Sequence, residues 1–471
     1  MSDLTDLTAG ELLAGYRNGT VSPVEATQAA LDAIEAGNCD VNAFVSVEAE
    51  SALQEASESE ARWRQGEPLG PGDGVPTSIK DIFYTRGRPT LRGTNLINAD
   101  APWDQDAPCV ARLRETGAVL IGKTATPEFA WKGVTDSLRH GSTGNPRAQG
   151  LTSGGSSGGS ATAVGLGMGP WSVGTDGGGS VRIPAAFTGT VAIKPTYGLV
   201  PMFPASPFGT LAHAGPMTRT VEDTALLLDV ITGFDSRDWS ALPTPAGSFL
   251  DGLDDGVKGM RVAFSPTLGF GINDPEIERL VRAAVDVLAD AGAVIEEVDP
   301  GIEDPVEAFH ILWFAGAAKV LEAYGPDAIN KVDPGLRRSI QEQGEISASD
   351  FLGATAVRMD LGVKMGLFHE TYDLLLTPTL PIPAFPRDRD APEGWHSPNW
   401  TSWTPYTYPF NMTQQPAISI PCGITEAGLP AGLQIIGPRH ADRKVLRAAQ
   451  TYEKAAAWGT ERPARLAAHH R

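Results

Sequence analysis

The chain has 471 residues, of which 41% are hydrophobic and 20% charged, a composition typical of a folded globular protein. Its net charge of −20 argues against a nucleic-acid partner and an anionic membrane surface, because both require clustered lysines and arginines. Cys39, Cys109 and Cys422 are too few and too dispersed for a disulfide framework. With no signal-peptide pattern and no run of about 18 apolar residues, we expect a cytoplasmic protein without a membrane span.

The first predicted elements are helices, and an alternation of strands and helices follows. Ser22 precedes a proline and an apolar spacing that continues through Ile34, which is the pattern of a capped helix. Beyond residue 75, short apolar runs predict buried strands at 118–121, 171–173 and 191–193, and helical patterns lie at 107–116 and 220–232. Such alternation favours an α/β sheet that is covered on both faces.

A connection rich in Asp, Pro, Gly and Ser at 233–258 separates this part from a second set of elements. The second set comprises a strand–helix–strand unit (260–264, 275–291, 293–298), helices over 303–372, strands at 374–377, 417–420 and 433–436, and a closing helix at 442–457. Neither an internal repeat nor a clear boundary interrupts it. We therefore predict one domain over 1–471, of class α/β, with a mixed, largely parallel sheet wrapped by helices.

Residues 386–410 differ from the rest, because tryptophans and tyrosines stand among prolines without helical or strand periodicity. One interpretation is a loop held in place by its own aromatic side chains. The other is an aromatic wall or lid over a pocket. The sequence alone leaves both open.

Two familiar motifs occur without their usual context. Residues 117–124 match the phosphate-loop pattern GxxxxGK[ST], but 118–121 is itself a strand pattern and a proline follows where a helix should run, so we predict no nucleotide site. Residues 154–158 match the GxSxG nucleophile elbow, but no apolar strand precedes them and no histidine has a telling context. There is no HxH or HExxH spacing either, so neither a metal nor another cofactor is expected.

Two glycine-rich segments, at 153–160 and 174–184, stand between apolar patterns rather than in a linker. Glycine in such a place indicates positive φ or a close approach of backbone to another group. Upstream, one lysine, Lys80, ends a semi-apolar run that begins at Gly74. By itself it would be an ordinary surface lysine.

Taken together, these segments resemble the amidase-signature family. The resemblance extends over a signature core at about 74–232, including the motifs Gly-Lys-Thr-Ala-Thr-Pro-Glu-Phe at 122–129, Lys-Pro-Thr-Tyr-Gly at 194–198 and Gly-Pro-Met-Thr-Arg-Thr-Val-Glu-Asp at 215–223. Matching motifs also occur late in the chain, at 376–379, 415–419 and 428–434. Several motifs in the same order make coincidence negligible.

The resemblance implies roles for individual residues. Lys80 matches the family's catalytic lysine, Ser156 the bridging serine that follows a cis peptide bond, and Ser180 the nucleophile. The amides of Gly177, Gly178 and Gly179 are expected to face the oxyanion, and Asp176 and Arg182 to fix that loop. Substrate contacts are predicted for five further residues: Trp131, Thr152, Ser153, Trp313 and Trp403.

Such a trio makes chemical sense, because amide hydrolysis must activate a serine and later protonate the leaving nitrogen. A free lysine has a pKa of about 10.4 and is charged, but burial can lower it toward ~7–8, where the amine accepts a proton. Ser156 would then relay a proton from Ser180 to Lys80 and return one to the amine.

The function predicted from the sequence is hydrolysis of a carbon–nitrogen bond in a small amide or hydrazide, with an aryl acyl group favoured by the aromatic residues at 395–410. The alternative is the glutaminase subunit of a tRNA-dependent amidotransferase, although its usual Ser-Ser-Leu-Asp-Gln stretch is absent from 207–215. A non-catalytic binding protein on the same fold is a third reading, which the intact Lys80, Ser156 and Ser180 disfavour. The expected partner is the small-molecule substrate, and a homodimer is left open.

Overall fold

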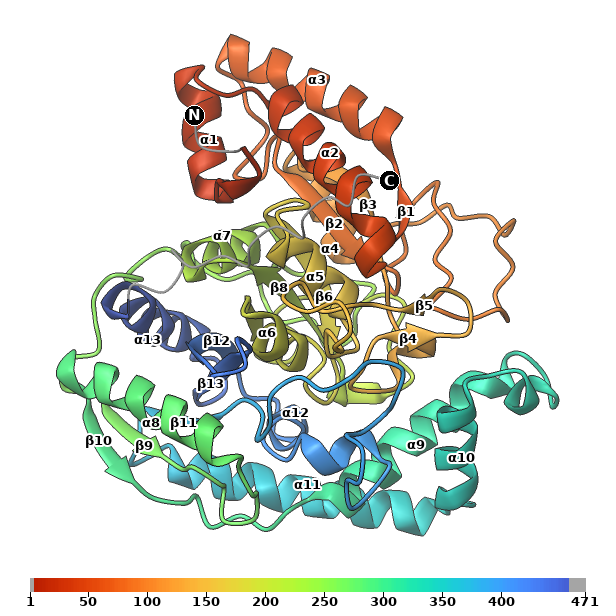
Figure 1. Ribbon diagram of the computed structural model, residues 1–471, viewed down its shortest axis with the longest axis vertical. Coiled ribbons are helices and arrows are strands. Elements are labelled where there is room, and N and C mark those ends of the chain that lie inside the picture. The colour runs from red at the N-terminus through yellow and green to blue at the C-terminus, as the bar shows by residue number, and fades with distance from the viewer. Residues whose placement is uncertain (1–3, 457–471) are drawn as a thin grey trace.

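The computed structural model describes residues 4–456, and one eleven-stranded sheet runs through them (Figure 1). Its strand order is β1-β3-β2-β6-β8-β7-β12-β13-β11-β9-β10. The strands are β1 (Phe44–Val47), β2 (Pro76–Lys80), β3 (Val119–Thr124), β6 (Trp171–Asp176), β7 (Val191–Lys194), β8 (His213–Thr218), β9 (Arg261–Phe264), β10 (Val294–Glu297), β11 (Leu374–Pro378), β12 (Ala417–Ile424) and β13 (Pro430–Ile436). A small separate ribbon pairs β4 (Asp136–Ser137) with β5 (Gly141–Ser142).

Pairing in the sheet is mixed. Two groups are parallel, β3-β2-β6 toward one end and β11-β9-β10 at the other, and the remaining six junctions are antiparallel. The predicted α/β class with a mixed, helix-wrapped sheet is therefore confirmed. Parallel pairing is less frequent than the alternating pattern suggested, because β8, β7, β12 and β13 succeed one another antiparallel in the middle of the sheet.

Thirteen α-helices occur in the described range. They are α1 (Ala9–Asn18), α2 (Pro23–Val41), α3 (Ala49–Gln65), α4 (Pro108–Glu115), α5 (Gly158–Gly165), α6 (Arg182–Thr188), α7 (Val221–Ile231), α8 (Pro275–Asp290), α9 (Val306–Glu322), α10 (Pro334–Gln343), α11 (Ala348–Phe368), α12 (Pro409–Met412) and α13 (Asp442–Ala455). Their starts follow the sequence signals: Ser22 and Glu25 form a reciprocal cap at α2, and Thr220 accepts from the Asp223 amide at α7.

The helices divide between the two faces of the sheet. Helices α7, α8 and α13 pack on one face and contribute to a core with the apolar side chains of β9, β12 and β13. On the opposite face, the short buried helices α5 and α6 lie against β6, β7 and β8, and α9, α10 and α11 lie beyond them (Figure 1). The two glycine-rich segments of the sequence lead into α5 and α6, so both segments meet at the centre of the molecule.

Most predicted elements are present, within a few residues. The predicted helical region 303–372 is three helices, α9, α10 and α11, and the closing helix ends at Ala455, with residue 457 outside the described range. Strands β1, β2 and β8 and helices α5 and α6 were not predicted. The last two are rich in small residues, and all of α6 and nearly all of α5 is buried, so neither shows an amphipathic pattern.

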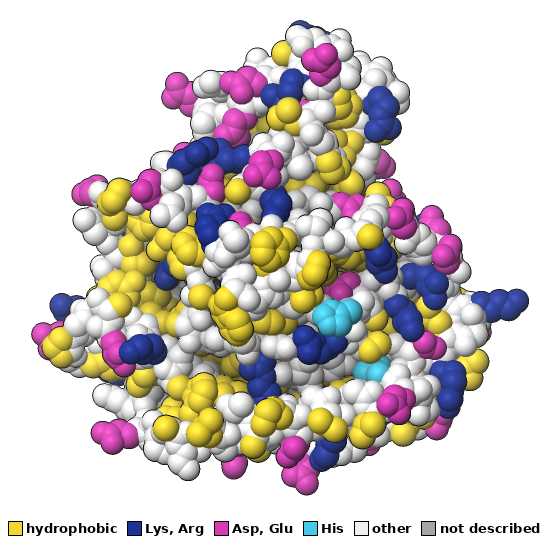
Figure 2. All heavy atoms as spheres, turned by 180° about the vertical axis from the view of Figure 1, so that it is seen from behind, with side chains coloured by type: hydrophobic (Ala, Val, Ile, Leu, Met, Phe, Trp, Pro, Cys, Tyr) yellow, Lys and Arg dark blue, Asp and Glu magenta, His cyan; other side chains and the backbone are white. Residues whose placement is uncertain are grey.

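Charge on the surface is dispersed. Basic and acidic side chains of the described residues alternate over the face shown in Figure 2, which presents no continuous basic band. Between residues 4 and 456, no helix is both long and apolar enough to cross a bilayer.

Candidate active site

Lys80 lies at the carboxyl end of β2, beside the carboxyl end of β6. The two strands are parallel and neighbouring, with Ile79 opposite Val173. Their ends therefore meet at one edge of the sheet, which brings Lys80 to Thr175. The Lys80 side chain is completely buried.

Three hydroxyl groups surround the Lys80 amine. Its Nζ lies 2.7 Å from Ser156 Oγ, 2.9 Å from Ser157 Oγ and 2.7 Å from Thr175 Oγ1. Ser157 already donates its hydroxyl proton to the Thr175 carbonyl, at 3.1 Å, so it can only accept from Lys80. A neutral amine has two protons and one lone pair. It can thus donate to Ser157 and Thr175 and accept from Ser156.

The electrostatics of the site favour that neutral amine. Burial holds the pKa of Lys80 well below its ordinary value, and the negative charge of Asp176 opposes this only in part. Asp176 is not in contact with Lys80 but is bound by Arg182, Gly179 and Asn411. A lysine with hydroxyl partners alone is equipped to take up a proton.

Ser156 is positioned by the turn that precedes α5. The Gly155–Ser156 peptide bond is cis, as the resemblance implied. Gly155 has no room for a side chain, because a Cβ there would lie 2.4 Å from the carbonyl carbon of Val134. The Ser157 amide donates to the Ser180 carbonyl at 3.1 Å, which ties the turn of Ser156 to the loop of Ser180.

The loop between β6 and α6 carries Ser180 and is fixed from below by an ion pair. Arg182 binds Asp176 through Nε and Nη2, both at 2.9 Å, as predicted for these two residues. Burial alone would raise the pKa of Asp176, but Arg182 and the other donors hold it well below its usual range. Asp176 therefore stays ionised as a structural anchor.

One predicted oxyanion donor is not supported. The Gly179 amide donates to Asp176 Oδ1 at 2.8 Å and is not available to a substrate oxygen. Gly179 instead has a positive φ of 125° and turns the chain. In the described part of the chain, the amides of Gly177, Gly178 and Ser180 have no hydrogen-bond partner, so these three amides are free to donate.

A pocket opens above Ser156 and Ser180, with about 730 Å³ of empty space when its solvent-open mouth is included. Aromatic side chains form much of its wall, and the segment 202–208 covers one side. The lining consists of Ile82, Phe83, Arg92, Phe129, Ala130, Ser156, Thr175, Gly177, Ser180, Met202, Phe203, Pro204, Ala205, Ser206, Pro207, Phe208, Ala212, Trp313 and Val320. Of the five predicted substrate contacts, only Trp313 belongs to it; Trp131, Thr152, Ser153 and Trp403 are buried outside it.

The aromatic residues at 400–410 pack behind the Ser180 loop and do not form a lid over the pocket. Trp400, Trp403, Tyr406, Tyr408 and Phe410 are all at most 2% exposed, and none lines the pocket. A Cβ added to Gly178 would meet Trp400 at 2.7 Å, and one added to Gly179 would meet Thr407 at 2.5 Å. The prediction of a lid was wrong for these residues, and the alternative of a packed loop is right. They support the Ser180 loop from behind.

The phosphate-loop lysine, Lys123, is committed to the protein interior. It lies in β3, forms an ion pair with Asp81 at 3.0 Å and donates to the carbonyl groups of Phe83 and Pro89. Its amine is therefore not free to bind a phosphate. In residues 4–456, no group of three or more His, Cys, Asp or Glu side chains is arranged to hold a metal ion.

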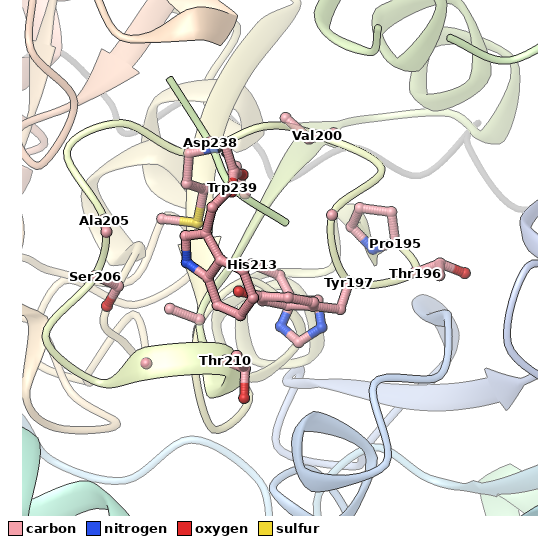
Figure 3. A pocket seen from close by; sticks show the side chains of 15 residues that line it. Pro195, Thr196, Tyr197, Val200, Ala205, Ser206, Thr210, His213, Asp238 and Trp239 are labelled. Carbon is pink, nitrogen blue, oxygen red and sulfur yellow. Dashed lines mark hydrogen bonds between the residues drawn. The ribbon is translucent and has the colours of Figure 1, made fainter. Parts of the chain in front are cut away.

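A second hollow is lined by residues of 195–214 together with Asp238 and Trp239 (Figure 3). Tyr197 and His213 face each other there with ring centroids 5.4 Å apart, and the 81%-exposed Trp239 stands at its rim. Burial holds the pKa of His213 well below its usual value, and its Nδ1 lies 2.8 Å from the Leu211 carbonyl. Neither Ser156 nor Ser180 lines this hollow, but Met202, Ala205, Ser206 and Ala212 line both it and the Ser180 pocket.

Sequence reasoning missed Ser157, Thr175 and the segment 202–208. Ser157 adjoins Ser156 in the same glycine-rich run, and Thr175 immediately precedes Asp176, so proximity in the sequence was an available signal for both. No pattern in 202–208 indicates that it covers a pocket. Its position depends on packing, including Phe208 stacked on Trp313 with centroids 4.0 Å apart.

Comparison with known proteins places this geometry in context. The family model described as Amidase matches residues 25–446. An acylamidase of Rhodococcus erythropolis is 37% identical over 465 residues, covering 97% of each chain. The A-type subunit of glutamyl-tRNA(Gln) amidotransferase from Geobacter sp. (strain M21) is 34% identical over 97% of this chain and 98% of its own. A crystal structure of a bacterial aryl acylamidase superposes with a TM-score of 0.89 at 31% identity over 96% of both chains.

Proposed function

This chain belongs to the amidase family, as a hydrolase of carbon–nitrogen bonds, and we propose that it is a stand-alone amidase that forms an acyl-enzyme at Ser180. The observation that carries the proposal is the fully buried Lys80 amine, in contact with three hydroxyls and no carboxylate, directly below a pocket that contains both Ser156 and Ser180. No ordinary structural role requires that arrangement.

The proposed reaction begins with proton transfer. Ser180 Oγ attacks the substrate carbonyl carbon while its proton passes to Ser156 Oγ, and the Ser156 proton passes to the lone pair of Lys80. The amides of Gly177, Gly178 and Ser180 stabilise the oxyanion, each by ~2.7–4 kcal/mol. The protons then return to the leaving nitrogen, the carbon–nitrogen bond breaks, and water releases the acid from Ser180 by the same relay.

Labelling tests the assignment of the nucleophile. The protein is treated with a fluorophosphonate, and the adduct is mapped by mass spectrometry in the wild type, Ser156→Ala and Ser180→Ala. We expect one adduct, on Ser180, which the Ser180→Ala variant lacks and the Ser156→Ala variant acquires slowly. An adduct on Ser156 in the wild-type protein would reverse the two roles.

We propose further that the preferred substrates are amides or hydrazides of aromatic acids. Support comes from the five aromatic side chains of the pocket: Phe83, Phe129, Phe203, Phe208 and Trp313. Flat rings gain ~0.5–1.5 kcal/mol per aromatic contact beyond area burial. Benzamide and benzhydrazide should therefore exceed acetamide in kcat/KM by at least ~10-fold. A preference for acetamide would remove the aryl proposal and leave the amidase proposal intact.

The second candidate is the glutaminase subunit of an amidotransferase, which the similarity to the Geobacter amidotransferase protein supports. Among the described residues, no Asp or Glu lines the pocket, so it offers no carboxylate partner for the ammonium group of glutamine. Hydrolysis of glutamine and benzamide by the purified chain distinguishes the two. Glutamine preferred over benzamide would favour the second candidate.

A further inference from the structure

The pocket above Ser180 contains one charged side chain, that of Arg92. The rest of its lining is aromatic, aliphatic or neutral polar. A guanidinium cannot lose its charge at physiological pH and needs oxygen partners when water is removed from around it. Arg92 is partly buried, so closure of a substrate over it would remove much of its remaining water.

Protein groups do not satisfy this guanidinium. Over residues 4–456, no carboxylate lies within 4.0 Å of it and its nitrogens donate no hydrogen bond; its Nε is buried without a partner. The guanidinium lies over the Tyr84 ring, whose centroid is 5.4 Å from Cζ. Neighbouring arginines differ: Arg88 donates to the Leu120 carbonyl and Arg139 to the Thr94 carbonyl.

The backbone of Arg92 is held in an unusual conformation. Its φ is +53°, which is uncommon for a residue with a side chain. The Arg92 amide donates to Asp81 Oδ2 at 3.0 Å, and its carbonyl accepts from the Phe129 amide at 2.8 Å. Asp81 follows Lys80 in the sequence and Phe129 lines the pocket, so Arg92 is fixed relative to both. Glycine would adopt this φ more easily, but would remove the charge.

We infer that Arg92 determines substrate specificity by binding a carboxylate on the substrate, at a position remote from the scissile bond. This inference rests on the proposed amidase function. The planar guanidinium matches a carboxylate with two parallel hydrogen bonds. Arg92 has no recorded contact with Lys80, Ser156 or Ser180, so the carboxylate it binds belongs to a different part of the substrate from the reacting carbonyl. The substrate class is therefore an aryl amide that carries an acid group at its far end.

Two matched pairs of anilides test the inference. One pair differs on the acyl side, the 4-nitroanilides of glutaric acid and of pentanoic acid. The other differs on the amine side, N-acetyl-3-aminobenzoate and N-acetyl-3-methylaniline. In at least one pair we expect the carboxylate-bearing member to have a kcat/KM about 10-fold higher or more, since hydrogen bonds to a charged group discriminate by at least that factor. Wild-type kcat/KM without a carboxylate preference in either pair would overturn the inference.

Variants locate the effect at Arg92. Arg92→Met keeps the length of the side chain and should abolish the preference, measured as the ratio of kcat/KM within each pair. Arg92→Lys should retain part of it, and Arg92→Glu should reverse it toward the 4-nitroanilide of 5-aminopentanoic acid. Arg64→Met is the matched control, because Arg64 is an exposed arginine of α3 paired with Glu60. A preference that persists in Arg92→Met would contradict the assignment.

A binding measurement separates this inference from the proposed function. Calorimetry with pentanoate and pentan-1-ol requires no catalysis. Pentanoate should bind the wild-type protein more tightly than pentan-1-ol, and Arg92→Met should lose this difference. If no amide, hydrazide or anilide tested is hydrolysed, the proposed function fails, and the pentanoate result still decides whether Arg92 binds a carboxylate.

Discussion

Two buried lysines of this protein each have three side-chain partners, and their chemistry is opposite. Lys80 contacts three hydroxyls, whereas Lys132 contacts three carboxylates, Asp136 at 2.8 Å, Asp333 at 3.1 Å and Asp390 at 2.8 Å. Burial lowers the pKa of Lys80 well below its usual value. Burial alone would also lower the pKa of Lys132, but the three carboxylates outweigh it and hold that pKa well above the usual value.

Lys80 and Lys132 are similarly buried, so in this pair the charge of the partners decides whether the amine is neutral or charged. Hydroxyls satisfy the amine without stabilising its positive charge as strongly as a carboxylate does, so Lys80 can be neutral and basic. Carboxylates stabilise the positive charge, so Lys132 stays protonated and its ion pairs join β4, the start of α10 and the segment around Asp390. The predictions below separate a lysine that serves catalysis from one that serves stability.

The largest effect is expected for Lys80→Ala on amide hydrolysis. Loss of the base should lower kcat/KM for an amide by ~10³-fold or more, because removing a member of such a catalytic unit has effects of this order. An activated ester needs less protonation of its leaving group, so its kcat/KM should fall markedly less. Assays of the wild type and the variant on benzamide and on 4-nitrophenyl benzoate give the two decreases in kcat/KM. Equal losses on both substrates would make Lys80 a structural residue, like Lys132.

Lys132→Met should have its effect on stability. The substitution leaves three buried or half-buried carboxylates without their cation, which typically costs ~3–5 kcal/mol of unfolding free energy. Urea unfolding monitored by fluorescence measures the loss, and kcat/KM per folded molecule should change less than threefold. Lys319→Met, which breaks only an exposed pair with Glu322, is the control and should cost below ~1 kcal/mol. A large drop in specific activity would contradict the assignment of Lys132 to stability alone.

The pH dependence sharpens the comparison. Because the folded-state pKa of Lys80 is lowered, the unfolded chain binds a proton there that the native protein does not, from the folded-state pKa up to about 10.4. Over that window Lys80 makes stability rise with pH, and Lys80→Met should remove this slope, up to ~1.4 kcal/mol per pH unit. The pKa of Lys132 is raised, so its contribution to the free energy of unfolding is fully present below about pH 10.4. The free energy lost in Lys132→Met should therefore be the same from about pH 6 to pH 9.

The same titration should appear in the kinetics. The rate of amide hydrolysis should rise with pH through the pKa of Lys80, since the neutral amine is the base. Thr175→Asp places a carboxylate beside Lys80 and imitates the surroundings of Lys132, so the rising limb should move to higher pH and activity at pH 7 should fall. Thr175→Val, which has the same size without the charge, should leave the limb near its wild-type position.

The smallest effect is expected for Ser157→Ala. Ser157 accepts from Lys80, accepts from the Thr175 amide and donates to the Thr175 carbonyl, so its loss leaves buried groups unpaired, at a cost of ~1–3 kcal/mol in stability. We expect kcat to fall about 10-fold, because Ser156 and Thr175 still bind the amine. Thermal unfolding and benzamide kinetics check both values. Complete loss of activity would make Ser157, rather than Ser156, the hydroxyl that relays the proton.

Much of the fold was predictable, because the late strands and α7, α8 and α13 have clear periodicity, and α7 and α8 also begin at capping residues. Residues Lys80, Ser156 and Ser180 were predictable as a group only through motifs, since they lie 76 and 24 positions apart and no local pattern joins them. The parallel pairing of β2 and β6 brings Lys80 to Thr175, and the turn before α5 places Ser156 against the same amine. By contrast, the pocket wall depends on side chains from segments such as 202–208 and α9, whose meeting no sequence pattern encodes.

The aromatic prediction illustrates the limit. Composition correctly marked 395–410 as unusual, but composition does not say which face of a ring is covered. Trp400 lies behind Gly178 and Trp403 stacks on Phe187, so both were removed from the pocket by long-range packing. Gly179 was misassigned for a similar reason, because its amide is used by Asp176, three residues away.

Trp313 has a consequence for attempts to redesign the substrate range. Its ring lines the pocket, and a Cβ on Gly177 would lie only 2.7 Å from it, so the same ring also supports the loop that presents Ser180. Replacing Trp313 with a smaller residue to admit larger substrates would therefore widen the pocket and also remove packing support from the Ser180 loop. Enlargement is better sought at Phe203 or Pro207, in a partly solvent-exposed segment that contacts the cavity without touching the glycines. Volume and catalytic geometry can be engineered separately only on that side of the pocket.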